Sequence, residues 1–179
     1  MNWLRPIAAL GAAFALVTSA APALAAALAA PNVVAISPTL VTSGQPTLSS
    51  LKALGSDGFN AVIYLAPTTV MDAVTGEADI VRGQGMEWIN IPIDFGEPTD
   101  VDLAKFFETM ERLKGRKVLV HCQVNMRAST FTFLYRVLSL REPPEQAYEA
   151  VAKVWSPRGS WKRLAVAQLQ KAGIAFNPY

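Results

Sequence analysis

Residues 117–129 read Lys-Val-Leu-Val-His-Cys-Gln-Val-Asn-Met-Arg-Ala-Ser, an apolar run followed by a polar loop. The apolar run, residues 118–120, is typical of a strand buried on both faces of a sheet. Beyond the loop, Phe131, Leu134 and Leu138 recur at helical spacing. The stretch therefore predicts a buried strand that turns directly into a helix.

The only cysteine and the only histidine of the chain, Cys122 and His121, lie together at this turn. Backbone N–H groups at a helix start attract anions, and the same field favours a thiolate over a thiol. Arg127 follows five residues after the cysteine and carries a fork-shaped cation suited to binding two oxygens at once. A nucleophile, an anion cradle and a fixed positive charge indicate chemistry on an oxyanion.

The loop resembles the active-site loop of the cysteine-dependent phosphatase superfamily, the protein-tyrosine and dual-specificity phosphatases. The shared features are His121 directly before Cys122 and a hydroxyl residue, Ser129, at the helix start. The family pattern is His-Cys-x5-Arg-Ser/Thr, whereas Arg127 comes one residue early and gives Cys-x4-Arg. Many rhodanese-like sulfurtransferases have a loop of this shorter length. Asn125 stands where many loops of both kinds carry glycine, and asparagine tolerates a left-handed backbone.

The resemblance extends to residues 41–47, 58–63 and 85–93, which look like a bacterial dual-specificity-phosphatase-like branch. It covers about residues 33–155 and implies a three-layer α/β/α fold around a central, mostly parallel sheet. The alternation of strand and helix patterns independently predicts an α/β protein with a parallel sheet covered on both faces. Ligands of such sheets bind beyond the carboxyl ends of the strands, where Cys122 lies.

The resemblance also implies roles for individual residues. Cys122 would be the nucleophile and Asp94, with Glu97 in reserve, the general acid. The phosphate would be bound by the loop residues Gln123, Val124, Asn125, Met126 and Arg127. The structural alternatives are a buried inert cysteine, a plain loop carboxylate and an arginine in a surface salt bridge.

His121 and Ser129 are expected to support this loop. Neighbouring residues of an extended chain point to opposite sides, so a papain-type pair of His121 with Cys122 is not expected. By resemblance, His121 holds the loop by hydrogen bonding, and Ser129 helps the thiolate leave in a second step. A satisfied core histidine and a hydroxyl bonded to the backbone are the alternatives.

Two helix starts and one C-terminal cluster complete the pattern. Thr47 is expected to cap one helix, and Thr99 with Asp102 to form a capping box for another. Near the C-terminus, four residues would form either a basic-aromatic rim or a packed core: Trp155, Pro157, Arg158 and Trp161.

Residues 1–30 resemble a secretory signal peptide, which leaves residues 31–179 as one phosphatase-like domain. Arg5 precedes an alanine-rich apolar run with Ala-x-Ala sites at 23–25 and 27–29. An uncleaved membrane anchor is the alternative. Cleavage would yield a periplasmic or secreted protein that is not held at a membrane, and its lone cysteine has no internal disulfide partner.

The net charge of +2 falls to +1 without Arg5 and does not favour nucleic-acid binding. One histidine and one cysteine exclude the usual nitrogen and sulfur zinc site, so we expect no metal and no cofactor.

The expected partner is a phosphorylated small molecule or a phosphoprotein. The sequence thus predicts an exported phosphatase that acts through a cysteinyl-phosphate. The alternatives are a non-catalytic anion-binding pseudophosphatase and a rhodanese-like sulfurtransferase that carries a persulfide on Cys122.

Overall fold

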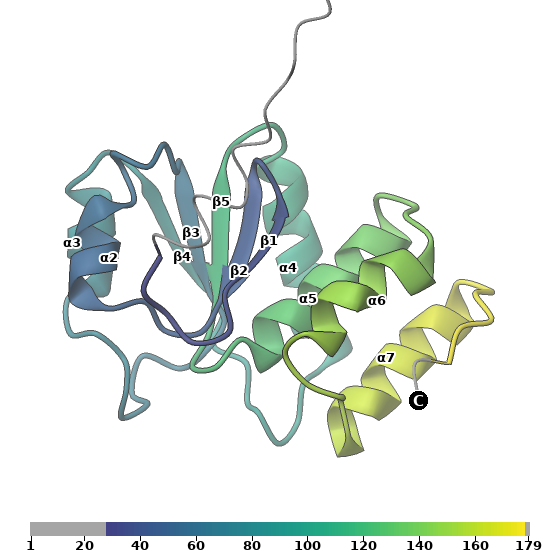
Figure 1. The fold of residues 1–179 in the computed structure, drawn as a ribbon. Helices are drawn as coiled ribbons and strands as arrows, with labels where there is room; N and C mark the ends of the chain where they lie inside the picture. The colour runs from purple at the N-terminus through teal and green to yellow at the C-terminus, as the bar shows by residue number, and fades with distance from the viewer. Residues whose placement is uncertain (1–27, 178–179) are drawn as a thin grey trace, which may run out of the picture.

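A five-stranded sheet forms the centre of the computed structural model, which describes residues 28–177 (Figure 1). The strands lie in the order β1-β2-β5-β3-β4, and only β1 runs antiparallel to its neighbour. Their bounds are β1 Val34–Ser37, β2 Leu40–Ser43, β3 Ala61–Tyr64, β4 Glu87–Asn90 and β5 Val118–His121. The mostly parallel sheet expected from the sequence is therefore confirmed.

Helices cover both faces of this sheet, which completes the predicted three-layer α/β/α fold (Figure 1). One face carries α2 (Leu48–Ala53) and α3 (Glu77–Arg82), and the other carries α4 (Asp100–Arg112) and α5 (Met126–Leu138). The remaining helices, α6 (Pro144–Ala152) and α7 (Gly159–Lys171), pack beyond α5 on the same side.

Successive side chains of the central strand β5 pack against opposite helix layers, because side chains alternate across a sheet. Leu119 packs with Leu51 in the core beneath α2 and α3. Val120 packs with Phe106 in the larger core beneath α4 and α5. The strand is apolar throughout because both of its faces are covered.

The two predicted helix starts are confirmed. Thr47 Oγ1 accepts a hydrogen bond of 3.2 Å from Ser50 N at the start of α2. At α4, Thr99 Oγ1 accepts from Asp102 N at 3.1 Å, and the Asp102 carboxylate accepts from Thr99 N at 3.0 Å. A cap of this kind contributes about 1 kcal/mol to helix stability. It also fixes the end of the β4–α4 loop that carries Asp94.

The first described residues are already part of the domain. The Leu28 side chain is buried. Ala29 N donates to Ser50 Oγ at 2.9 Å, and Ala29 O accepts from Thr47 N at 3.0 Å. Most of the predicted signal peptide lies outside the described residues, so that prediction and the boundary at residue 31 stay predictions. No helix within residues 28–177 has the length and apolar character needed to cross a bilayer.

The strand register brings the ends of four strands together at one edge of the sheet. His121 is paired with Ser43 on one side and with Tyr64 on the other, and Tyr64 is paired in turn with Asn90. The loops that follow these strands therefore meet at the carboxyl edge, where α/β proteins bind ligands.

Candidate active site

The candidate active-site loop, residues 122–127, connects β5 to α5 at this edge. Cys122 is a free, fully buried cysteine whose backbone N–H donates to Ser43 O at 3.2 Å. Asn125 has φ = 71° and precedes the first residue of α5. The left-handed conformation expected at this position is confirmed, and Asn125 O accepts the hydrogen bond from Ser129 N at 2.9 Å.

The Asn125 side chain holds the loop against β2 and against the segment that precedes β1. Its Nδ2 donates to Asn32 O at 2.6 Å and to Thr42 Oγ1 at 3.1 Å. Asn32 Nδ2 in turn donates to Val124 O at 3.0 Å. Glycine would adopt the same backbone angle but could not form these bonds. Asparagine thus supplies both the turn and its anchor.

The β2–α2 loop supports the candidate active-site loop from one side. Gln45 N donates to Gln123 O at 2.9 Å. A Cβ atom on Gly44 would lie 2.6 Å from the same Gln123 O, so this position has no room for a side chain. The absence of a side chain at Gly44 lets the two loops approach closely.

The loop presents a series of backbone donors. Within residues 28–177, no protein acceptor receives the N–H groups of Gln123, Val124, Met126 and Arg127, whereas Asn125 borders the isolated bridge between Val124 and Gly44. Part of this is general, since the first N–H groups of any helix have no partner inside the helix. Free N–H groups at a helix start form an anion-binding concavity. Val124 is 40% exposed and Met126 is half-buried, so the loop reaches the surface.

Arg127 is buried beside these donors, with only 5% of its surface exposed. Its Nε donates to Ile93 O at 3.1 Å, and its Nη1 donates to Gln123 Oε1 at 3.3 Å. Arg127 forms no ion pair with any described residue. The alternative of an arginine in a surface salt bridge is therefore wrong. A buried guanidinium without a counter-charge is unfavourable unless it binds an anion.

Behind the loop, His121 belongs to a buried polar cluster centred on Glu77. His121 Nε2 lies 2.9 Å from Glu77 Oε1, and the imidazole stacks on the Tyr64 ring with centroids 4.6 Å apart. Glu77 also accepts hydrogen bonds from Trp88 Nε1 at 2.9 Å and Gln45 Nε2 at 2.6 Å. His121 is thus bonded to a carboxylate on α3, as a loop-supporting residue would be.

Two ionisable groups of this cluster have shifted pKa values. Burial raises the pKa of Glu77, but the hydrogen bond and charge of His121, with the bonds from Trp88 and Gln45, outweigh it, and the pKa is lowered. Burial and the nearby Glu77 raise the pKa of Tyr64, so its hydroxyl stays protonated. Glu77 therefore carries a buried negative charge that three donors stabilise.

Glu77 is the site residue that sequence reasoning missed. It stands in the first turn of the short helix α3, 44 residues before its partner His121. A helix start is an ordinary place for an acidic residue, so its position did not single it out. The usable signal was the lone histidine itself, because a buried imidazole needs a polar partner.

Asp94, the predicted general acid, lies on the β4–α4 loop next to Ile93, whose carbonyl binds Arg127. Its side chain is exposed, and its Oδ1 accepts a hydrogen bond of 2.7 Å from Gly96 N. The carboxylate is therefore held by a turn of its own loop. Glu97, the reserve, is also exposed. The catalytic role of either residue stays a prediction.

Ser129 is buried in the first turns of α5. Its Oγ donates to Met126 O at 3.2 Å, and Thr130 Oγ1 donates to the same carbonyl at 2.9 Å. The Ser129 hydroxyl is thus bonded to the backbone, which was the alternative to a catalytic role. Its role in the second step stays a prediction.

The C-terminal aromatic cluster combines both predicted alternatives. Trp161 is 2% exposed and packs in the core, whereas Trp155 is half-buried and Arg158 is exposed. Among residues 28–177, no group of three or more histidine, cysteine, aspartate or glutamate side chains is placed to hold a metal ion.

Comparison with known proteins identifies a phosphatase family. Residues 32–164 match the family model described as "DSP-PTPase phosphatase fused to NAD+ Kinase". The crystal structure of a DUF442 protein from Shewanella putrefaciens CN-32 is 30% identical, with a TM-score of 0.73 over 80% of this chain and 92% of that chain. No match was found among curated proteins.

More distant structures share the fold. PTPMT1 in complex with PI(5)P is 22% identical, with a TM-score of 0.63 over 77% of this chain and 94% of that chain. TpbA from P. aeruginosa in complex with pTyr is 18% identical, with a TM-score of 0.56 over 76% of this chain and 81% of that chain. Because the family model covers most of the chain, the protein belongs to the DSP-PTPase family of cysteine-dependent phosphatases.

Proposed function

We propose that this protein hydrolyses phosphomonoesters through a cysteinyl-phosphate on Cys122. The substrate is a phosphorylated small molecule or a phosphoprotein. The buried Arg127, which has no counter-charge among the described residues, carries the proposal together with the free N–H groups of Gln123, Val124 and Met126. These donors and this charge fit the oxygens of a phosphoryl group next to the only thiol of the chain.

The reaction has two steps. The Cys122 thiolate attacks phosphorus, the ester P–O bond breaks, and its electron pair goes to the leaving oxygen, which takes a proton from Asp94. A water then attacks phosphorus and gives a proton to the Asp94 carboxylate, while the S–P bond breaks and the thiolate and inorganic phosphate are released. Arg127 and the loop N–H groups stabilise the charge on the phosphoryl oxygens in both steps.

In the first step, Asp94 must turn from its present partner, Gly96 N, towards the leaving oxygen. The Ser129 hydroxyl lies one helical turn into α5 and assists departure of the thiolate in the second step. His121 acts as a positioning residue, because its ring is bonded to Glu77 on the side of the sheet that carries α3.

Phosphomonoester hydrolysis by residues 28–179, compared with a Cys122→Ser variant, tests the proposal. We expect phosphate release from an aryl phosphate to fall by at least about 10⁴-fold in the variant, because no second group can replace the nucleophile. Equal rates for the two proteins, after both are shown to be folded by circular dichroism, would overturn it.

Anion binding without turnover is the second candidate, and the complete burial of Cys122 favours it. In that case phosphate would raise the melting temperature of the wild type and of Cys122→Ser equally, and neither would release phosphate from an ester. The sulfurtransferase alternative gains no support, because the family model that matches describes a phosphatase.

Export is part of the same proposal. The alanine-rich run and Ala-x-Ala sites of residues 1–30 support it. Expression of the full chain in a bacterium, followed by cell fractionation and N-terminal sequencing, should give a shortened protein in the periplasm or the medium. A full-length protein in the cytoplasm or the membrane would contradict export but not the chemistry.

A further inference from the structure

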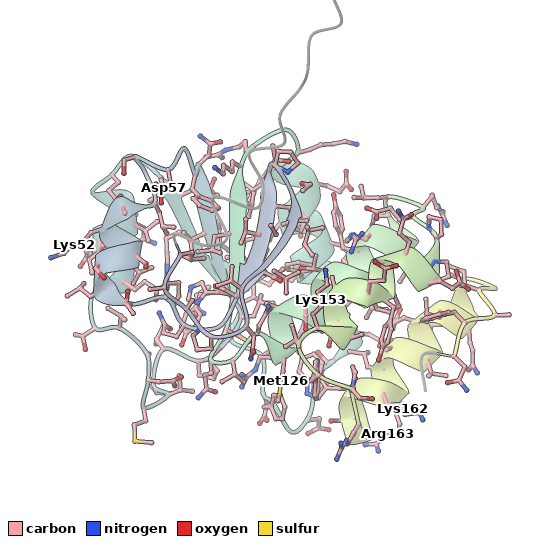
Figure 2. All side chains as sticks on the ribbon, in the orientation of Figure 1. Lys52, Asp57, Met126, Lys153, Lys162 and Arg163 are labelled. Carbon is pink, nitrogen blue, oxygen red and sulfur yellow. The ribbon has the colours of Figure 1, made fainter. Side chains whose placement is uncertain are left out.

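A groove of about 690 Å³ opens beside the candidate active-site loop. Its walls come from the β4–α4 loop, the first residue of α5, the connection between α6 and α7, and the first turn of α7. Figure 2 shows Met126 at the lower edge of the domain, towards the first turns of α7, where Lys162 and Arg163 lie. Grooves that bind small organic molecules have volumes of about 300 to 1,000 Å³.

Three aromatic rings form one wall of this groove. The ring centroid of Phe95 lies 5.7 Å from that of Trp161 and 6.0 Å from that of Trp155, and the two tryptophans are 6.2 Å apart. Trp161 Nε1 donates to Phe95 O at 2.8 Å, which ties the β4–α4 loop to α7. Phe95 is nevertheless 40% exposed. The wall is therefore formed in advance and presents flat apolar surface to solvent.

The groove has no negative charge of its own. None of its lining residues is an aspartate or glutamate, and its ionisable lining residue is Arg158 at the rim. A ligand that carries a phosphate can therefore enter it without repulsion from a carboxylate in the wall.

The groove is continuous with the candidate active-site loop. Met126 lines the groove and is one of the predicted phosphate-binding residues. Arg127 follows it directly and places its guanidinium carbon 5.1 Å from the centroid of the Phe95 ring. A phosphoryl group held by Arg127 would therefore direct the rest of its molecule along the aromatic wall.

The size of the groove indicates how large this remainder is. An apolar cavity of about 150 Å³ holds one benzene ring, and the groove is several times larger. Tilted aromatic rings favour a flat partner that can stack on one ring and present its edge to another. A single ring would leave much of this surface exposed.

We propose that this groove is a specificity subsite for the esterified group of the substrate. It selects phosphomonoesters whose apolar group is flat and larger than one ring, and Trp155 is its specificity-determining residue. The inference rests on the proposed function, since the same loop holds the phosphate.

The test compares kcat/KM for three phosphomonoesters: phenyl, 2-naphthyl and octyl phosphate. We expect 2-naphthyl phosphate to exceed phenyl phosphate by about 10-fold in the wild type, and octyl phosphate to lie well below it. Trp155→Ala should lower the naphthyl-to-phenyl ratio to about 1, and Trp155→Phe should restore part of it. Phe176→Ala is the matched control, because Phe176 lines a separate groove with Ile174, and it should leave the ratio unchanged.

A binding measurement separates this inference from the proposed function. Titration calorimetry on Cys122→Ser compares 2-naphthyl phosphate with inorganic phosphate, with and without Trp155→Ala. Tighter binding of the naphthyl ester that depends on Trp155 supports the subsite even if the wild type hydrolyses nothing, in which case only the proposed function fails.

Three results would overturn the subsite. One is hydrolysis of both aryl esters with a ratio that Trp155→Ala does not change. Another is equal preference for the octyl and naphthyl esters. The third is absence of turnover combined with a naphthyl ester that Cys122→Ser binds no better than inorganic phosphate, and this result would end the proposed function as well.

Discussion

Behind the candidate active-site loop, the Glu77 carboxylate accepts hydrogen bonds from three side chains, His121, Trp88 and Gln45. In front of it, the Arg127 guanidinium has no carboxylate partner among residues 28–177. Both groups are charged and almost fully buried. A buried charge that the protein pairs internally serves the fold, whereas one that it leaves unpaired is available to a ligand.

The comparison predicts that substitutions behind the loop lower stability, and that substitutions in front of it lower activity while the fold persists.

Arg127 should show the largest separation of activity from stability. Arg127→Lys keeps the charge but loses the fork, so we expect kcat/KM for an aryl phosphate to fall by about 10² to 10³-fold. Arg127→Met removes the unpaired charge and should leave the free energy of unfolding in phosphate-free buffer unchanged or higher. Steady-state kinetics measures the first effect. Urea unfolding measures the second, and added vanadate should stabilise the wild type but not Arg127→Met. A large loss of stability in Arg127→Met would show that Arg127 stabilises the fold, as Glu77 does.

Glu77→Ala should have the largest effect on stability. It removes the acceptor of three hydrogen bonds and leaves His121 buried beside a cavity, so we expect about 3 kcal/mol less free energy of unfolding. Urea denaturation at pH 7 measures this value. Asp72→Ala is a control in front of the loop, since the exposed Asp72 accepts a hydrogen bond from Gln123 Nε2. A change for Glu77→Ala no larger than that of this control would contradict the account.

The same carboxylate predicts a dependence on pH. Because the pKa of Glu77 is lowered from 4.5 in the folded protein, its charge contributes stability above the unfolded value, and this contribution is lost as the pH falls through the folded value. The difference in unfolding free energy between wild type and Glu77→Gln should therefore shrink as the pH falls below about 4.5. A difference that stays constant down to pH 3 would show that the charge of Glu77 does not stabilise the fold.

Asp94→Asn should lower activity by an amount that depends on the leaving group. A general acid contributes about 10² to 10⁴-fold for a poor leaving group and little for a good one. Hydrolysis of phenyl phosphate should fall by about 10²-fold, and that of p-nitrophenyl phosphate much less. Glu97→Gln is the matched control on the same loop. If only Glu97→Gln gives this pattern, then Glu97 is the acid.

Asn125 should give the smallest of these effects. Asn125→Gly keeps the left-handed backbone and loses the bonds to Asn32 and Thr42, which we expect to cost about 1 kcal/mol. Asn125→Ala loses the same bonds and adds backbone strain of about 1 kcal/mol more. Thermal unfolding of the two variants measures the difference, and equal stability of both would mean that the φ of 71° is not retained.

These regions also differ in how well the sequence predicted them. Local chemistry was sufficient for the Thr99–Asp102 capping box and for the left-handed Asn125, because both depend on residue type and immediate neighbours. The strand β5 and its turn into α5 followed from hydrophobic pattern alone. Glu77 was not predicted as a site residue, because its partners His121 and Gln45 are distant in sequence and only the folded sheet brings them to it.

The front of the loop shows a different limit. The residues Cys122 and Arg127 were found from their spacing, but spacing did not reveal that Arg127 binds Ile93 O or that Asp94 binds its own turn. Those contacts depend on how the β4–α4 loop folds over α5. The same fold buries Trp161 almost completely and leaves Trp155 half-buried, although both tryptophans line the groove and belong to one short segment.

The most direct test of the central claim is to look for the phosphoryl group on the Cys122 sulfur. Residues 28–179 mixed with an aryl phosphate and quenched in acid within milliseconds are digested and analysed by mass spectrometry. The account predicts one phosphoryl group on the peptide that contains Cys122, with an amount that rises in Ser129→Ala because its release is slower. Substrate turnover with no phosphoryl group on this peptide, or with phosphate attached elsewhere, would contradict it.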